Sequence, residues 1–257
     1  MILTADFHTH TPYSHGKNTV DENVARAKEL GLTSIGITDH GFSHIIYGLR
    51  RRKFADYKKE CKAAEEKYGV KVLVGIESNI RGESGLTDLT EKDYENFDLF
   101  LCGHHILLNY ETLKDWMRYF FFGSLPARFG WKGTKKLAAA NTKSYIAAIQ
   151  KNPIDIITHL NFLAPCDVVE VAKCAADYGT YIELNGKKEH LSDEQLLAVA
   201  DTGVRFVIDS DAHSADRVGD FERVREQLSR LNFPLDRIDN IDGRTPAFRF
   251  ADYKKRM

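Results

Sequence analysis

The sequence has no long apolar segment and almost no net charge, and each absence excludes a class of protein. No stretch approaches the roughly 20 consecutive apolar residues that a membrane-spanning helix needs. The start of the chain lacks a basic segment followed by an apolar one, so we expect no secretory signal, a cytoplasmic location and no membrane partner. With 36 basic and 37 acidic residues, the chain has no overall charge to attract nucleic acid, which we do not expect as a partner.

Cysteines are scarce, and linkers and repeats are missing. The four cysteines, Cys61, Cys102, Cys166 and Cys174, form no CxxC pair. Without a secretory signal, this usage indicates free thiols in a reducing compartment. The sequence also has no low-complexity tract, so we expect residues 1–257 to form one domain.

The chain does contain an alternation of short apolar runs with longer amphipathic ones. These runs are short and consist mostly of β-branched and other apolar residues, as in strands that are buried on both faces. They predict seven strands, at 2–7, 33–38, 71–77, 98–103, 154–159, 180–184 and 205–209. Seven strands separated by helices favour an α/β fold with a parallel sheet closed as a (β/α)7 barrel. A flat doubly wound sheet fits the same alternation.

Capping and stop residues mark the helices between these strands. Thr19 and Glu22 form a capping-box pattern, and Gly31 ends the helix that follows. Further helices are predicted over 54–68, from 167 to 178, from 192 to before 203, over 215–231, and from Thr245 with Pro246 in its first turn. The aromatic-rich segment at about 108–137 is predicted to be an insertion after the fourth strand.

Polar residues capable of binding metals follow the carboxyl ends of six predicted strands. In a parallel barrel these ends converge on one face, where active sites lie. The residues are His8, His10, His15, Asp39, His40, Glu77, His104, His105, His159, Asp209, Asp211 and His213.

One histidine at a strand end is usually a surface or capping residue. A structural explanation for all of these residues would require a buried polar cluster without a purpose, which is energetically costly. Imidazole combined with carboxylate suits zinc, manganese or iron, and so many ligands exceed the needs of one ion. The sequence therefore predicts a site for two to three divalent ions.

Six motifs resemble those of the polymerase and histidinol phosphatase (PHP) family of metal-dependent phosphoesterases, in its small stand-alone bacterial form. They span nearly the whole chain: DFHTHTPYSHG, GITDHG, GIESNI, LCGHH, ITHL and DSDAHS. The resemblance implies a distorted seven-stranded β/α barrel with a trinuclear metal site at the carboxyl ends of its strands. One departure follows strand five, where small members often have Thr/Ser-His-Pro and this chain has THLN.

Carried over by position, the resemblance implies nine metal ligands, with Glu77 bridging two ions. His8 and His10 would hold one metal and His15 another. The set is His8, His10, His15, His40, Glu77, His105, His159, Asp211 and His213. Glu77, Asp211 and His213 would also be catalytic. Asp39 and Asp209 are expected to hydrogen-bond ligating imidazoles.

The implied activity is hydrolysis of a small phosphate ester by metal-bound hydroxide. Histidinol phosphate, nucleotides and sugar phosphates all remain open as substrates. The residues expected to contact the substrate are Arg81, Lys187, Asn185 and His104, with Arg50–Lys53 as a second choice. His104 and His44 are candidates for the general acid. Trp116, Tyr119, Phe120 and Arg128 form either a lid over the substrate or an outer packing or dimer contact.

Other functions and assemblies stay open. The first is a phosphodiesterase or 3′–5′ exonuclease acting on nucleotides. The second is an amidohydrolase-type C–N hydrolase, although that class usually places a metal-bridging lysine after strand four, where this chain has CGHH. A non-catalytic partner domain is the third, although such domains tend to lose ligands. A homo-oligomer is compatible with the sequence.

Overall fold

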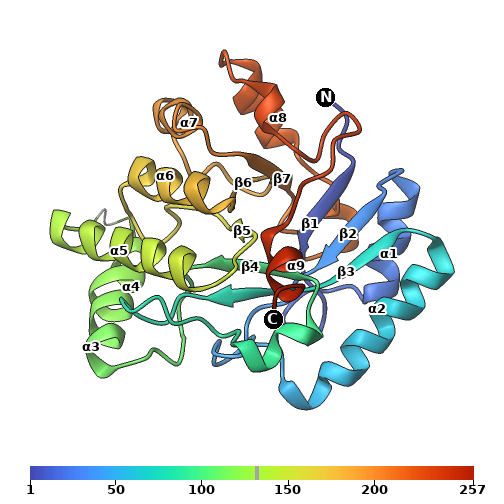
Figure 1. The fold of residues 1–257 in the computed structure, drawn as a ribbon, viewed down its shortest axis with the longest axis horizontal. Helices are drawn as coiled ribbons and strands as arrows, with labels where there is room; N and C mark the ends of the chain where they lie inside the picture. The colour runs from blue at the N-terminus through green and yellow to red at the C-terminus, as the bar shows by residue number, and fades with distance from the viewer. Residues whose placement is uncertain (131–132) are drawn as a thin grey trace.

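Seven parallel strands form the centre of the molecule, and helices surround them (Figure 1). The computed structural model describes residues 1–130 and 133–257. The strands pair in sequence order, which confirms the barrel and excludes a doubly wound sheet, in which the order reverses. They are β1 (Ala5–Thr9), β2 (Ser34–Ile37), β3 (Lys71–Asn79), β4 (Leu99–Gly103), β5 (Ile156–Ile157), β6 (Tyr181–Asn185) and β7 (Phe206–Asp209).

Helices cover the outside of the barrel. The longer ones are α1 (Val20–Glu29), α2 (Phe54–Tyr68), α5 (Lys135–Lys151), α6 (Val168–Tyr178), α7 (Asp193–Ala200) and α8 (Glu222–Ser229). The others, all shorter except the nine-residue η3, are η1 (Arg51–Lys53), η2 (Glu91–Asn96), α3 (Leu113–Asp115), η3 (Trp116–Ser124), α4 (Leu125–Arg128), η4 (Ala215–Arg217), η5 (Leu235–Arg237) and α9 (Arg249–Lys254). Within residues 1–130 and 133–257, no helix is long and apolar enough to cross a membrane.

The barrel is nearly closed, and side chains join its first and last strands. At the carboxyl ends, the His10 amide donates to the Ala212 carbonyl at 2.8 Å, and the Ala212 amide donates to the His8 carbonyl at 3.2 Å. Lower down, Asp209 accepts a hydrogen bond from the β1 backbone at 2.7 Å. The Asn240 amide donates to a carbonyl of each strand, at 2.9 and 2.6 Å. This seam holds the first and last histidine motifs side by side.

The barrel interior is apolar at its amino-terminal end and polar at its carboxyl-terminal end. Alternate residues along each strand face inward. The apolar layer consists of Ala5, Phe7, Leu99, Leu101, Ile156, Tyr181 and Val207. Phe248 closes the bottom, with its ring centroid 4.9 Å from that of Phe7. Further along β3 and β6, the same alternation turns Glu77 and Glu183 into the mouth of the barrel.

An irregularity in β1 turns its histidines inward. The pairing with β2 advances by three residues along β1, from Asp6 to Thr9, but by only two along β2. One extra residue of this kind interrupts the alternation of side chains between the two faces. Phe7 therefore lies in the apolar interior while the next residue, His8, also faces inward. His10 follows on the same side, above the apolar layer.

Several predicted boundaries were wrong, among them those of strand five, which covers Ile156–Ile157 rather than 154–159. The first strand begins at Ala5 rather than at residue 2. The helix predicted over 215–231 is divided into η4 and α8, because Gly219 adopts a left-handed conformation (φ 71°) and its amide donates to the Asp6 carboxylate at 2.8 Å. The last helix begins at Arg249 rather than near Thr245, because the preceding residues are extended and fill the bottom of the barrel.

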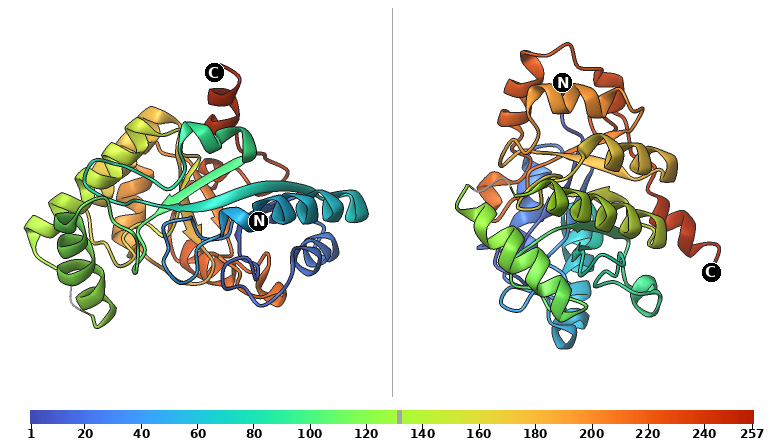
Figure 2. Two further views of the ribbon diagram at one scale, coloured as in Figure 1. Left: turned by 90° about the horizontal axis from the view of Figure 1, so that it is seen from below. Right: turned by 90° about the vertical axis from the view of Figure 1, so that its left-hand side faces the viewer.

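Residues 108–137 contain α3, η3, α4 and the start of α5, which the sequence did not predict. Figures 1 and 2 place α3 and α4 beside α5 at one end of the molecule. The Tyr119 hydroxyl lies 3.4 Å from the Ala140 carbonyl of α5, and its ring packs on His104. Of the two alternatives expected for this segment, Tyr119 therefore follows the second, an outer packing contact rather than a lid over the substrate. Residues 131 and 132 of this segment lie outside the described residues.

One buried carboxyl connects α9 to the barrel. Asp155 precedes β5 and accepts hydrogen bonds from the Phe100 amide of β4 at 3.0 Å and from the Phe250 amide of α9 at 2.8 Å. Burial raises the pKa of Asp155 to about 7.

This raised pKa makes stability depend on pH. The ordinary pKa is 3.8, so the folded chain binds more protons at this site than the unfolded chain, and the contribution to stability is lost as the pH rises to about 7. Relative to Asp155→Asn, which does not titrate, the wild type should lose about 1 kcal/mol of unfolding free energy per pH unit between about pH 4 and 7. Urea denaturation at several pH values measures the difference, and a pH-independent difference would contradict this.

Candidate metal centre

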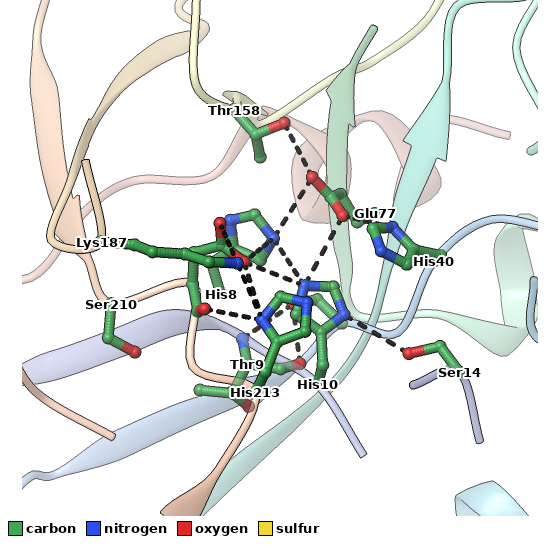
Figure 3. A network of polar contacts seen from close by, with 12 residues as sticks. His8, Thr9, His10, Ser14, His40, Glu77, Thr158, Lys187, Ser210 and His213 are labelled. Carbon is green, nitrogen blue, oxygen red and sulfur yellow. Dashed lines mark hydrogen bonds and ion pairs between the residues drawn. The ribbon is translucent and has the colours of Figure 1, made fainter. Parts of the chain in front are cut away.

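A buried cluster of histidines and carboxylates fills the mouth of the barrel around Glu77 (Figure 3). The two carboxylate oxygens of Glu77 face different histidines. Oε1 lies within 3.3 Å of an imidazole Nε2 of each of His8, His105 and His159. Oε2 lies 2.7 Å from His40 Nδ1 and 3.6 Å from His10 Nε2. A carboxylate between two sets of imidazoles is suited to bridging two cations.

Asp211 forms a second focus on the other side of the cluster. Its Oδ1 atom lies 3.3 Å from both His10 Nε2 and His213 Nδ1, and 3.8 Å from His8 Nε2. The other oxygen, Oδ2, is 3.3 Å from Lys187 Nζ. His10 Nε2 thus lies between a Glu77 oxygen at 3.6 Å and an Asp211 oxygen at 3.3 Å.

Among the described residues, three overlapping groups of donor atoms lie close enough for metal binding. In each group the donors are within 4.8 Å of one another. The groups are His8, His10 and Asp211; His10, His40 and His213; and His40, Glu77 and His105. The overlap at His10 and His40 means that the three groups form one continuous cluster.

The donor set fits metal ions because its imidazole nitrogens and carboxylate oxygens lie close together but do not satisfy one another by hydrogen bonds. His8 Nε2 lies 3.1 Å from His10 Nε2, and His105 Nε2 lies 3.2 Å from His159 Nε2. Glu77 Oε2 and His40 Nδ1 are buried and lie 2.7 Å apart without the geometry of a hydrogen bond, and neither has another hydrogen-bond partner within the described parts of the chain. Such unsatisfied atoms are costly in a protein interior, and a divalent cation would satisfy them.

The electrostatics of the cluster favour metal-binding protonation states at Glu77, His40 and His10. At His8, by contrast, burial is outweighed by Glu77 and Glu183, which raise the pKa of that imidazole, so a metal bound there would displace a proton. Burial raises the pKa of Glu77, but His105, His8 and His40 outweigh it and hold that pKa well below its ordinary value. Burial also lowers the pKa of His40 to about 3 and that of His10 well below its ordinary value. Glu77 is therefore ionised and these two imidazoles are neutral, as ligation requires.

Two predicted ligands have backbone conformations that non-glycine residues rarely adopt. His159 has φ 31° and Asp211 has φ 50°. Such conformations cost about 1–3 kcal/mol each and persist where the surroundings hold them. Here Glu183 accepts from the His159 amide at 2.6 Å. Backbone strain is thus present where β5 and β7 deliver these side chains to the cluster.

His15 lies at the edge of the cluster rather than in one of the three donor groups. Its ring stacks on that of His40, with the centroids 4.8 Å apart and the planes at 8°. Tyr47 stacks on it at 4.6 Å. The His15 Nδ1 atom is buried and lacks a hydrogen-bond partner among the described residues. His15 is thus near the cluster, with an unsatisfied donor atom.

Asp39 and Asp209 do not make the hydrogen bonds to ligating imidazoles that we expected. Asp39 accepts from the amides of Thr11 at 2.8 Å and Ser14 at 3.1 Å, and so shapes the loop after β1. It reaches His10 only through the Ser14 hydroxyl, which lies 3.5 Å from His10 Nδ1. Asp209 instead binds the β1 backbone in the barrel seam. A short distance in the sequence from an expected ligand was a poor guide here.

Glu183, which the sequence reasoning missed, makes the hydrogen bond that those residues do not. Its Oε1 atom lies 2.5 Å from His8 Nδ1, and Oε2 accepts from the Asn185 amide at 2.9 Å. A carboxylate in this position fixes the orientation of the imidazole and directs Nε2 toward the cluster. The signal was present in YIELN, where Glu183 alternates with Asn185 on the inward face.

Several residues expected to contact the substrate lie elsewhere. His104 points to α5, where its Nε2 is 2.9 Å from the Ser144 hydroxyl, and burial lowers its pKa to about 3. The Arg81 guanidinium donates to a backbone carbonyl at 2.7 Å. In the Arg50–Lys53 run, Arg51 forms an ion pair with Asp93. These interactions give each side chain a structural partner.

His44, Asn185 and Lys187 lie closer to the cluster. The His44 ring is 5.2 Å from that of His40, and its Nδ1 accepts from a backbone amide at 3.1 Å. Asn185 lies 3.5 Å from Asp211 and accepts from the Lys187 amide at 3.0 Å. Asn185 therefore positions its neighbours, while Lys187 projects its ammonium group to the cluster.

Comparison with known proteins agrees with this geometry. Residues 6–232 match the model of the PHP domain. The chain belongs to the PHP family. A protein of Proteus mirabilis (strain HI4320), named a probable phosphatase, is 32% identical over 253 residues, which cover 95% of this chain and 92% of that protein. A probable phosphatase of Caldanaerobacter subterraneus is 31% identical over 255 residues, covering 93% and 88%.

The fold of this PHP-family chain is shared with a histidinol phosphate phosphatase of Lactococcus lactis, solved with zinc, L-histidinol and phosphate. The TM-score is 0.60 at 14% identity, and the match covers 91% of this chain and 95% of the other. The resemblance inferred from the histidine motifs is therefore confirmed at the level of family and fold.

Loss of the Glu183 carboxylate should weaken metal binding. Glu183→Gln removes the negative charge beside His8 Nδ1, and such losses reduce metal affinity by roughly 10–100-fold. Competition with a chelator of known affinity, followed by elemental analysis, measures this. The control is Glu170→Gln on the exposed face of α6, which should bind metal like the wild type. Unchanged affinity in Glu183→Gln would contradict the role of Glu183.

Proposed function

We propose that this PHP-family chain is a metal-dependent phosphomonoesterase that acts on a small phosphorylated molecule. The observation that carries the proposal is the buried Glu77 carboxylate, shared between two sets of imidazoles beside an open pocket. The proposed ligands are His8, His10, His15, His40, Glu77, His105, His159, Asp211 and His213, holding two to three ions of zinc, manganese or iron. The phosphatase names of the relatives support this assignment.

When bound, the ions would supply activation of water at neutral pH and offset the charge of a phosphoryl group. The chain's own residues orient the reaction around them. Glu77 keeps its charge beneath the site, and Glu183 holds His8 in place. Asp211 and His213 lie at the pocket side of the cluster. Lys187, 3.3 Å from Asp211 and 3.1 Å from His213, brings a positive charge to where phosphoryl oxygens would lie.

The pocket beside the cluster supports a small substrate rather than a polymer. It has a volume of 360 Å³, within the range of small-molecule sites. It is lined by His159, Phe162, Lys187, Lys188, His190, Asp211 and Arg223. His159 and Asp211 belong to the metal cluster, so a molecule in the pocket would reach the ions directly. This arrangement favours the phosphatase over the exonuclease alternative.

The amidohydrolase alternative is less well supported. That class usually has a metal-bridging lysine after strand four. Here β4 leads to His105, whose Nε2 lies 3.0 Å from Glu77 Oε1, and the shared carboxylate comes from β3.

Hydrolysis of 4-nitrophenyl phosphate with added manganese or zinc tests the function. Glu77→Gln should lower kcat/KM by about 100-fold or more, because the neutral amide cannot hold two cations together. Glu66→Gln on the exposed surface of α2 is the matched control and should keep wild-type activity.

Elemental analysis of the same preparations should find two to three ions per wild-type chain and fewer in Glu77→Gln. Wild-type activity in Glu77→Gln, or full activity after exhaustive chelation, would contradict the proposed function.

A further inference from the structure

The pocket beside the cluster contains two cations that phosphoryl binding leaves unused. Lys187 is already paired with Asp211. Lys188 and Arg223 line the same pocket from the loop after β6 and from α8. Within residues 1–130 and 133–257, neither side chain has a carboxylate within ion-pair distance. Two free positive charges thus face a cavity that opens onto the metal ligands.

The acidic residues next to these cations are paired with other arginines. Glu189 follows Lys188 in the sequence, but it binds Arg230 at 2.8 Å. Glu222 precedes Arg223, but it binds Arg225 at 2.5 Å. Neighbouring arginines of α8 are therefore neutralised, whereas the two cations that line the pocket are not. This difference is what a binding site for an anion requires.

Between these cations and the cluster lie two aromatic rings. The Phe162 and His190 centroids are 5.0 Å apart, and the His190 ring is 5.9 Å from that of His159. Lys188 Nζ lies 6.0 Å from the centroid of the Phe162 ring. The rings offer contact area for the organic part of a ligand that extends from the metal ligands toward Lys188 and Arg223.

We propose that the substrate is a phosphate ester whose organic part carries a second anionic group, bound by Lys188 and Arg223. The inference rests on the proposed phosphomonoesterase function. The metal cluster and Lys187 hold the phosphoryl group that is removed, and Phe162 and His190 contact the body of the molecule. The second group is a carboxylate or a phosphate, since both present oxygens to cations. An ester with an ammonium group, such as histidinol phosphate, would be repelled at this position.

A series of aryl phosphates that differ only in a para substituent tests the charge preference. The substituents are methyl, carboxymethyl, phosphonomethyl and aminomethyl, and the enzyme is the full chain loaded with manganese. We expect kcat/KM for the better of the two anionic esters to exceed that for the methyl ester by about 10-fold, mainly through KM, and the aminomethyl ester to be the poorest. The two anionic esters distinguish a carboxylate from a phosphate.

Variants connect the preference to the two side chains. Lys188→Met and Arg223→Met should each reduce the anionic-to-methyl ratio of kcat/KM by about threefold or more, and the double variant should abolish it. Arg225→Met is the matched control on α8, since Arg225 pairs with Glu222 and lies outside the pocket lining, and it should keep the wild-type ratio.

Equal kcat/KM for all four esters, or a preference that survives in the double variant, would overturn the inference while leaving the phosphatase function intact. If none of the esters is hydrolysed with zinc, manganese or iron, the phosphatase function and the inference are overturned together.

Discussion

The charge of Glu77 is the constraint around which the mouth of the barrel is organised. An ionised carboxylate in a protein interior is unfavourable unless its surroundings compensate it. Imidazoles from four other strand ends surround this one, and each is oriented by its own strand. The apolar layer beneath excludes water from one side. The Glu77 charge is therefore compensated from particular directions. Imidazoles approach it from the strand ends of the barrel, and the remaining open side faces the pocket.

The cluster could be predicted from the sequence because its geometry follows from topology. Parallel strands in a barrel bring their carboxyl ends together, so residues far apart in the chain had to meet. The family resemblance also selected His105 rather than His104 as a ligand, and the structure brings His105 to Glu77 while His104 faces α5. Topology determines which segments meet, without any knowledge of individual contacts.

The remaining features depend on contacts that spacing does not encode. Asp39 directly precedes His40, and Asp209 lies two residues before Asp211, yet both carboxylates bind backbone amides. The inward turn of His8 depends on one extra residue in β1, which local pattern does not reveal. The break before α8 requires a contact between Gly219 and Asp6, more than 200 positions apart in the chain. Residues that hold ligands were thus harder to predict than the ligands.

The seam between β1 and β7 also determines when the molecule can be completed. His8 and His10 are synthesised more than 200 residues before Asp211, His213 and the seam residue Asn240. Contacts between such distant segments carry a large loop-closure entropy and form late. A nascent chain therefore carries the histidines of β1 without these partners while the intervening strands and helices are synthesised. The cluster is assembled only when the last strand arrives, which makes metal acquisition a closing step of folding.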